Sequence, residues 1–566
     1  MFQRLATKHD LTPFTTAATL TLFAFFAVFL FYPIAYMFQH AFWVEGRVSL
    51  AFFKLIVTNP VTRASVVNSL VIGLTTTVVT TLLALPLAFC MVKFEFRGKG
   101  LLSGLLLVPM IMPPFVGAIG IKQVLARYGS LNLLLMEIGV ISAPVDWLGD
   151  GGFCGIVALE TLHLYPIMYL NVAAALANVD PSLEEAGLNL GAGPFRLFRT
   201  ITFPLMLPGY FAGASIVFIW AFTDLGTPLI FEYRRVVPVQ IYDNVTSLHE
   251  NPAGYALVVF VLLVTVALFY ASKRYMGRTS YAMAGKGAVA SRQTYLGWVG
   301  TAAMVGFCVL LIGLAILPHL TVFLTAITDK WFMTVLPERV TLKYFEQAVT
   351  HKIAASSIRN SVLLSFASTA LDIALGVAIA YLLTRRRVPG REVLDAIAML
   401  PLALPGLVLA FGYVACFSGT ALDPRGNPFP LLIIAYAVRR LPYMVRAAYA
   451  GFQQVSVTLE EASLNLGAPP FTTLRKITVP LIMGNLIAGS ILAFSFAMLE
   501  VSDSLLLAFK EQYYPMTKAI YQLQGRITDG EYIACAMGML GMALLTVSLL
   551  LAGRFLGRRM GELFRA

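Results

Sequence analysis

The sequence predicts an all-α polytopic membrane protein with about twelve transmembrane helices, arranged as two parallel repeats of six helices. Composition is the first observation behind this fold class: of 566 residues, 58% are hydrophobic and 12% are charged. A soluble domain typically carries about 25% charged residues. The second observation is that runs of roughly 20 apolar residues, the length that crosses ~30 Å of hydrocarbon, recur along the chain. The third is that the two halves of the chain repeat one another.

The apolar runs place the spans along the chain. The first run, TAATLTLFAFFAVFLFYPIAYMF, is longer than the core of a signal peptide and no A-x-A cleavage site follows it, so a retained first span is expected. The predicted spans are 16–40, 64–92, 101–125, 153–178, 206–232, 254–276, 295–327, 357–384, 392–418, 430–452, 482–509 and 532–556.

Clusters of basic residues predict the orientation of these spans. They lie at 93–99, 273–278 and 385–387 and in the tail at 554–565, all beside span ends on one side of the membrane. Clustered Lys and Arg next to a span remain in the cytoplasm, so both termini are expected on the cytoplasmic face of a bacterial-type inner membrane. The net charge of +12 is then a consequence of topology. The expected partner is the lipid bilayer, with no nucleic acid.

Matching residues in the two halves define the repeat. Asn68-Ser69 recurs 292 residues later as Asn360-Ser361, and the prolines of the third span recur with the same offset, whereas the proline of the fourth span recurs 276 residues later. The predicted organisation is a first half at 1–276, a cytoplasmic linker at 277–294 and a second half at 295–566. Because each half holds an even number of spans, the repeats are parallel and related by an axis along the membrane normal. Such a fused pseudo-dimer is expected to enclose a path on its axis.

A polar segment of 22 residues is also present twice, between the fourth and fifth spans of each half. EEAGLNLGAGPFRLFRTITFPL starts at Glu184, and EEASLNLGAPPFTTLRKITVPL starts at Glu460. Each copy predicts a helix-turn-helix elbow on the cytoplasmic face, the first elbow at 182–204 and the second elbow at 458–480.

Local signals set the predicted bounds of each elbow. In the first copy, Ser182-x-x-Glu185 is a capping box that marks a helix start. Gly191 stands where a left-handed residue ends a helix. A second short helix is expected to begin at Pro194 and to stop before Pro204. The equivalent residues of the second copy are Thr458, Glu461, Gly467, Pro470 and Pro480.

Two roles remain open for the elbows from physics alone. Apolar residues such as Leu188 and Phe195 would be poorly buried by a lone loop, which favours a docking surface for a cytoplasmic partner. The alternative is that each elbow packs against its own membrane domain.

The two segments resemble the EAA loop of ABC-importer permeases, whose pattern is E-A-A, three residues, Gly, nine residues and I-x-L-P. The first copy supplies Glu185-Ala186-Gly187, Gly191 and Ile201-Thr202-Phe203-Pro204, and the second supplies Glu461-Ala462-Ser463, Gly467 and Ile477-Thr478-Val479-Pro480. The departures, Gly187, Ser463, Phe203 and Val479, exchange small for small or apolar for apolar residues.

The resemblance implies that each elbow is a coupling helix seated in a groove of an ATPase subunit. The coupling residues that it implies are Glu184, Glu185, Gly191, Pro204, Glu460, Glu461, Gly467 and Pro480. Fused permeases of this size look most like the ferric-iron, thiamine and 2-aminoethylphosphonate importers. That likeness implies a type I importer fold, two copies of a cytoplasmic ABC ATPase and an extracytoplasmic solute-binding protein. ATP and Mg would be bound by the ATPase, with no cofactor on this chain.

Catalytic and metal-binding motifs are absent from the sequence. The patterns GxxxxGK[ST], HExxH and GxSxG occur nowhere. The five Cys residues include no CxxC pair, so no zinc site is indicated. The chain is therefore expected to be a transport permease and not an enzyme. An ion-coupled secondary transporter, which also has twelve spans in two halves, is the alternative class, although the elbows have no evident role there.

Ionisable residues at bilayer depth are the candidate translocation path, because such residues usually face the interior of a bundle. They are Glu160, His163, Asp224, Arg439, Arg440, Arg446, Glu500 and Asp503. Three interpretations are open: these residues line the path, they pair with one another and lock the halves together, or their charged ends snorkel to the membrane interface. His163 alone is more typical of a packed histidine than of a ligand.

The charge of the solute is inferred from the adjacent arginines. A path for bare ferric iron would favour carboxylates and tyrosines. Arg439 and Arg440 instead favour a small anionic organic solute such as a phosphonate, with Glu160 facing an amine. Ferric iron and thiamine are the alternatives.

Overall fold

The fold is all-α, as predicted. The computed structural model describes residues 12–44, 46–111, 113–245, 253–278, 294–526 and 529–556, so almost all of the predicted linker at 277–294 lies outside the described residues. Strands in the described part of the chain are two residues long. They are β1 (Trp43–Val44) antiparallel to β2 (Arg47–Val48), and β3 (Phe94–Glu95) parallel to β4 (Thr294–Tyr295).

Eight helices within the described residues are long and apolar enough to cross a membrane. They are Pro13–Phe42 (α2 to α3), Pro60–Lys93 (α5), Phe153–Ala177 (α9), Pro194–Ile230 (α11 to α13), Ala253–Ser272 (in α15), Trp298–Ala326 (α16), Lys352–Arg385 (α18) and Gly530–Leu551 (in α28). Three bent helix pairs raise the number to eleven if each pair is one span. The chain is therefore a multi-pass membrane protein.

The predicted span at 430–452 is not among these eleven. It is the helix α21 (Phe429–Gln454), which carries Arg439, Arg440 and Arg446 and is less apolar than the other spans for that reason. Helix α21 packs against α18 and α25 (Met483–Met498), so neighbouring protein covers much of its surface. Charged side chains in a membrane protein are expected in such a protein-facing position.

The third span of each half is broken at its prolines. Lys99–Ile111 and Pro114–Glu137 meet at 94°, and Arg391–Leu402 and Gly406–Phe417 meet at 101°. The second pair contains α19 (Arg391–Met399) and α20 (Gly406–Phe417), and Pro405 precedes α20 in an extended conformation. Proline removes a helical hydrogen bond and restricts the preceding residue, so these bends follow directly from the sequence.

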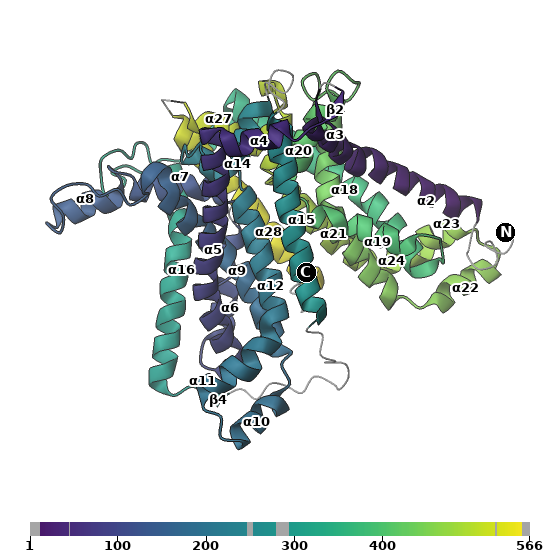
Figure 1. Cartoon of the computed structure of the whole chain (residues 1–566), viewed down its shortest axis with the longest axis horizontal. Coiled ribbons are helices and arrows are strands. Elements are labelled where there is room, and N and C mark those ends of the chain that lie inside the picture. Colours follow the sequence, from purple (N-terminus) through teal and green to yellow (C-terminus); the bar gives the residue numbers. More distant parts are fainter. Residues whose placement is uncertain are drawn as a thin grey trace. The chain divides into compact units, whose positions relative to one another are not determined.

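The chain forms two compact units that do not follow the sequence repeats. The α9 unit comprises residues 59–240 and 263–344, and the α21 unit comprises residues 12–58, 241–262 and 345–556. In the α9 unit, α5, α9 and α12 (Phe203–Thr223) run alongside one another (Figure 1). Each unit is thus built mainly from one half of the sequence but contains the first span of the other half, which we call its leading span. The α9 unit contains α16, and the α21 unit contains α2 to α3.

Specific contacts hold these leading spans. In the α21 unit, Tyr413 of α20 donates a hydrogen bond of 2.7 Å from Oη to the carbonyl oxygen of Phe29 in the first span. In the α9 unit, α16 packs against α7 (Pro114–Leu125). A Cβ atom added to Gly120 would lie 2.6 Å from the carbonyl oxygen of Pro318, so the two backbones approach closely at this glycine.

The repeated Asn-Ser pair has the same structural role in both units. Ser69 Oγ accepts a 2.8 Å hydrogen bond from the backbone N–H of Val237, the first residue of α14 (Val237–Asn244). Ser361 Oγ accepts a 2.7 Å bond from the N–H of Met516, the first residue of α27 (Met516–Gln524). Helices α14 and α27 are therefore equivalent elements, each tied to a long span by a serine hydroxyl that satisfies an unpaired helix N-terminal donor.

Candidate coupling elbows and intramembrane charge sites

The first elbow begins two residues earlier than its predicted capping box. Helix α10 (Pro181–Asn189) is capped by Asp180, whose carboxylate accepts a 2.9 Å hydrogen bond from the N–H of Ser182. The predicted cap at Ser182 is wrong because Pro181 occupies the first helical position and leaves residue 180 as the cap. The hydrogen bonds from Ser182 lower the pKa of Asp180. In the second elbow, α22 (Val457–Asn465) is likewise capped by Ser456 instead of Thr458.

The turn at each glycine agrees with its prediction. Gly191 has φ +80° and Gly467 has φ +86°, both in the left-handed region. The N–H of Ala192 donates to the carbonyl oxygen of Gly187 at 3.0 Å, and the N–H of Ala468 donates to that of Ser463 at 3.2 Å. These bonds satisfy carbonyl groups at the helix C-terminus, as expected of a helix that ends in a left-handed residue.

The helix after the first turn does not stop before Pro204, which corrects the prediction. Helix α11 (Pro194–Leu197) continues through a π-helical turn, η4 (Phe198–Thr202), into α12, and Pro204 lies near the start of α12. The π turn changes the hydrogen-bond register, so the missing N–H of the proline is accommodated. In the second elbow, η7 (Leu474–Thr478) and α24 (Val479–Leu481) continue past Pro480 to a 77° bend before α25.

An inward-facing glutamate anchors each elbow to the end of a long span. Glu184 accepts from Lys93 Nζ at 2.5 Å and from Thr202 Oγ1 at 2.8 Å. Lys93 is the last residue of α5, so this ion pair joins the elbow to the end of that span. In the second elbow, Glu460 accepts from Arg385 Nε at 2.9 Å and from Thr478 Oγ1 at 3.1 Å.

Small residues allow the two short helices of each elbow to pack together. A Cβ atom at Gly187 would lie 2.7 Å from side-chain carbons of both Leu197 and Ile201. Ser463, its equivalent, is buried, and its hydroxyl lies 2.9 Å from Thr473 Oγ1. The departures at the third position of the EAA pattern, Gly187 and Ser463, therefore occupy tightly packed positions in which a small side chain is required.

The outer face of each elbow remains apolar and exposed. Leu190 and Leu466, at equivalent positions before the turn glycines, are 88% and 89% exposed. Glu185 and Glu461 are also exposed. The other exposed large apolar residues are Leu183, Leu188 and Phe195 in the first elbow and Val457, Leu459, Leu464 and Phe471 in the second. Each elbow is thus held to its own unit on one side and presents apolar side chains on the other.

Two of the predicted intramembrane residues of the α9 unit, Glu160 and Asp224, both accept hydrogen bonds from Thr227. Thr227 donates from Oγ1 to Glu160 Oε1 at 3.1 Å and from its backbone N–H to Asp224 Oδ2 at 2.8 Å. Glu160 is buried on α9, and Asp224 ends α12. His163 lies apart from them, with Nδ1 3.1 Å from the carbonyl oxygen of Pro109 in the broken third span. This α9 charge site contains two carboxyl groups and, among the described residues, no ion pair to a basic side chain.

The predicted residues of the α21 unit form ion pairs instead. Arg439 Nη1 lies 2.5 Å from Glu500 Oε1 and 3.6 Å from Asp503 Oδ2. Arg440 binds the other oxygen of Glu500 and donates to the carbonyl oxygen of Phe496 at 3.2 Å. Arg446 lies outside this α21 charge site and pairs with Asp395 of α19 at 3.4 Å. Whether either site contacts a solute stays a prediction.

Sequence reasoning missed one member of the α21 charge site. Asp372 of α18 is fully buried, interacts electrostatically with Arg440, and its two carboxylate oxygens have no hydrogen-bond partner within the described residues. Its signal was visible, since it is a lone carboxylate in the apolar run STALDIALG. Within the described residues, no group of three His, Cys, Asp or Glu side chains is placed to hold a metal ion.

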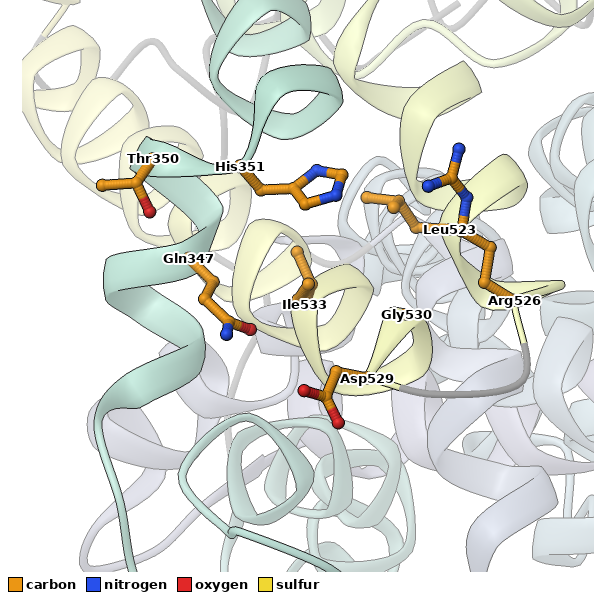
Figure 2. Close-up of a pocket in the computed structure, with 8 residues that line it drawn as sticks. All are labelled: Gln347, Thr350, His351, Leu523, Arg526, Asp529, Gly530 and Ile533. Atoms are coloured by element: carbon orange, nitrogen blue, oxygen red, sulfur yellow. The ribbon is translucent and has the colours of Figure 1, made fainter.

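A pocket of about 390 Å³ lies elsewhere in the α21 unit. Its lining includes Gln347, Thr350 and His351, at the junction of α17 (Lys343–Thr350) and α18, and Arg526 and Asp529, near the start of α28 (Gly530–Leu556). Figure 2 shows the side chain of His351 directed toward Leu523 and Arg526. None of the predicted path or coupling residues lines it.

Known proteins resemble the chain over most of its length. It is 28% identical over 498 residues to a putative ferric transport system permease protein of Haemophilus influenzae, which covers 86% of this chain and 77% of that protein. It is 28% identical over 481 residues to a ferric transport system permease protein of Actinobacillus pleuropneumoniae, covering 83% and 68%. A molybdenum transport system permease protein of Escherichia coli matches over 207 residues at 28% identity, covering 35% of this chain and 86% of that protein.

Residues 80–280 and 372–562 each match the family described as "Binding-protein-dependent transport system inner membrane component". One match falls in each half, and each contains one elbow and one charge site. The predicted resemblance is confirmed, and the chain belongs to this family as an ABC-importer permease with two fused halves.

Proposed function

We propose that this chain forms the membrane path of an ATP-driven importer for a small solute that an extracytoplasmic binding protein delivers. The single observation that carries the coupling part of this proposal is the equivalent apolar tips of the elbows, Leu190 and Leu466, each almost fully exposed. Exposed apolar clusters of this kind mark interaction sites. Two such tips match two copies of a cytoplasmic ABC ATPase, which would bind ATP and Mg.

The anchoring of the elbows supports a role in transmitting movement. Glu184 ties the first elbow to the end of α5, and the helix continues from the elbow through the π turn into α12. Glu460 ties the second elbow to the end of α18. A partner that moves either elbow would therefore move two spans together as a rigid body, which is one of the standard routes to a conformational switch. In this arrangement the elbows and both termini are cytoplasmic, in the inner membrane.

The solute that we favour is a small anionic organic molecule such as a phosphonate. Arg439 and Arg440 support this solute less strongly than the sequence suggested, because both guanidinium groups already pair with Glu500. An amine group of the solute would still find two carboxyl groups without a basic partner in the described structure, Glu160 and Asp224, in the α9 charge site.

Ferric iron is the second candidate, with thiamine as a further alternative. Two similar proteins are described as ferric transport permeases. The carboxyl pair Glu160 and Asp224 also suits a cation better than an anion. An ion-coupled secondary transporter is not favoured, because the family match is to binding-protein-dependent systems.

The coupling proposal is tested by replacing both turn glycines with aspartate, Gly191→Asp plus Gly467→Asp. A Cβ atom at either glycine would meet no atom within 4 Å, so the elbow itself has room for the side chain. The new carboxylate beside each apolar tip would have to lose its water when a partner docks, which is costly. We expect the variant to insert in the membrane and to lose co-purification of the ATPase.

The matched control is Gly191→Asn plus Gly467→Asn. Asparagine has the same shape as aspartate and tolerates the left-handed conformation, but it carries no charge. This control should retain most of the ATPase. Full retention of the ATPase by the aspartate variant would contradict docking at the elbows.

A further inference from the structure

Two equivalent tyrosines meet in the α21 unit. The serine anchors align Val237 with Met516, and the same alignment makes Tyr242 of α14 the equivalent of Tyr521 of α27. Their ring centroids lie 6.5 Å apart, with the rings at 86°. Within the α21 unit, equivalent residues of the two repeats therefore lie side by side.

This contact lies at the ends of the spans that are remote from the elbows. Helix α12 begins at the first elbow and ends before α13 (Gly226–Ile230) and α14. Helix α25 begins after the second elbow and ends before α26 (Ser502–Leu507) and α27. If the elbows are cytoplasmic, the tyrosine contact is on the outward side of the membrane.

A buried lysine accompanies the tyrosine contact. Lys518 of α27 is 6% exposed, and its Nζ donates to Tyr242 Oη at 3.1 Å and to the carbonyl oxygen of Leu505 at 2.9 Å. The Nζ atom also lies 5.3 Å from the ring centroid of Tyr242 and 5.8 Å from that of Tyr514. These partners are neutral, and cation–π contacts of this kind stabilise an ammonium group without a counter-ion.

The charge of Lys518 is not explained by packing. Its equivalent in α14 is Val239, which is fully buried, so an apolar residue fills the same position in the other repeat. Burial lowers the pKa of Lys518 to about 8, so most of the ammonium remains protonated at neutral pH. A buried cation is normally paired with a carboxylate. Here, among the described residues, the ammonium has only neutral partners.

We propose that Lys518 is the anion-contacting group on the outward side of the path, and that separation of Tyr242 from Tyr521 exposes its ammonium to a carboxylate, phosphate or phosphonate group of the solute. This inference rests on the proposed import function. Under this proposal the anion is selected by Lys518, which has no carboxylate partner in the described structure. Arg439 and Arg440 would not select it, because both are already paired with Glu500. The competing role is structural, with Lys518 serving only to join α14 to α26.

The experiment compares two thiol reagents of similar size, methanethiosulfonates that carry either a sulfonate or a trimethylammonium group. The reporter is Tyr521→Cys in a chain whose five natural cysteines are replaced, purified with its ATPase. With Lys518 present, the sulfonate reagent should react about tenfold faster than the ammonium reagent, the effect of one nearby positive charge on two opposite charges in water. Lys518→Met should remove most of this ratio.

Two controls separate the electrostatic role from a structural one. Lys510→Met removes an exposed positive charge from the same connection between α26 and α27, and it should leave the ratio unchanged. Tyr242→Cys is a second reporter in case Tyr521→Cys does not assemble. A structural role for Lys518 predicts that Lys518→Met changes both reaction rates by the same factor.

Two results would overturn the proposal. The first is a reagent ratio that Lys518→Met leaves unchanged. The second is a failure of both reagents to react at either reporter position in any nucleotide state, since the site would then be outside the water-accessible path. The measurement needs only the assembled protein, so it can fail while ATPase docking at the elbows succeeds, and the reverse also holds.

Discussion

The two charge sites occupy equivalent places in the two repeats but are built from opposite chemistry. Asp224 aligns with Glu500 and Thr227 aligns with Asp503, whereas Glu160 aligns with Tyr436. The Tyr436 hydroxyl lies 2.6 Å from Ser504 Oγ, where the first repeat has a carboxyl–threonine contact. The duplication has kept polar side chains at equivalent positions of the two repeats but has changed which of them carry a charge.

This difference shows that repeat symmetry in the backbone does not extend to the electrostatics. The α9 charge site has carboxyl groups that meet a hydroxyl and a backbone N–H. The α21 charge site has two guanidinium groups that share one carboxylate, Glu500. Removing a carboxyl group should therefore destabilise the second repeat much more than the first.

The largest expected effect comes from Glu500→Gln. It leaves the carboxylates of Asp503 and Asp372 to balance the charges of Arg439 and Arg440, and removing one partner of a buried ion pair costs about 3–5 kcal/mol. We expect a large loss of thermal stability and of assembled protein, measured by heating the purified complex and following its size-exclusion profile.

The matched change in the other repeat is Glu160→Gln. The amide retains an oxygen for the Thr227 hydroxyl and removes a buried carboxyl group that has no basic partner in the described structure. Stability should change by no more than about 1 kcal/mol, the scale of one ordinary hydrogen bond. Equal losses in the two variants would refute the contrast between the charge sites.

The elbows give a second comparison, in which the two repeats differ in the number of bonds. Arg385 donates to Glu460 and to the carbonyl oxygens of Phe452 and Val455, at 2.7 to 2.9 Å. Lys93 makes one such bond, to Glu184. Lys93→Met should cost about 1.5–3 kcal/mol, the contribution of one hydrogen bond to a charged group. Arg385→Met loses three such bonds and should cost more, and in both variants methionine keeps the apolar stem.

Protease cleavage within each elbow, measured beside thermal stability, checks this order. Arg385→Met should increase cleavage at 458–480 and leave 182–204 unchanged, and Lys93→Met should do the reverse. If either variant loosened both elbows equally, the anchors would not be local and the comparison would fail.

The sequence predicted features that depend on local patterns. Apolar runs placed the spans, and the turn glycines Gly191 and Gly467 were correctly assigned to the left-handed region, because hydropathy and φ preference belong to single segments. The predicted cap at Ser182 lies two residues beyond the observed one because Asp180 and Pro181 offered a stronger local signal than the capping box.

Features that depend on distant packing were not predictable in this way. Nothing in the first span indicates that Phe29 will meet Tyr413, or that the leading spans pack in the unit of the other half. The pairing of Arg439 and Arg440 with Glu500 was one of three open interpretations, since spacing along the chain does not say which helices become neighbours. Lys518 gave no signal at all, because its burial arises from α14 and α26.

The smallest expected effect belongs to Arg446→Met, which tests whether every arginine of α21 belongs to the α21 charge site. Arg446 pairs with Asp395 at 3.4 Å, but the two side chains are 45% and 38% exposed. Exposed ion pairs contribute about 0–1 kcal/mol because water and salt screen them. Arg446→Met should therefore leave assembly, ATPase co-purification and solute uptake close to those of the unmodified protein.

About 0.5 M salt should abolish any residual difference in stability, given a Debye length of only about 3 Å at 1 M salt. A loss comparable to that of Glu500→Gln would mean that Arg446 is electrostatically part of the buried cluster, and that α21 carries three coupled arginines instead of two.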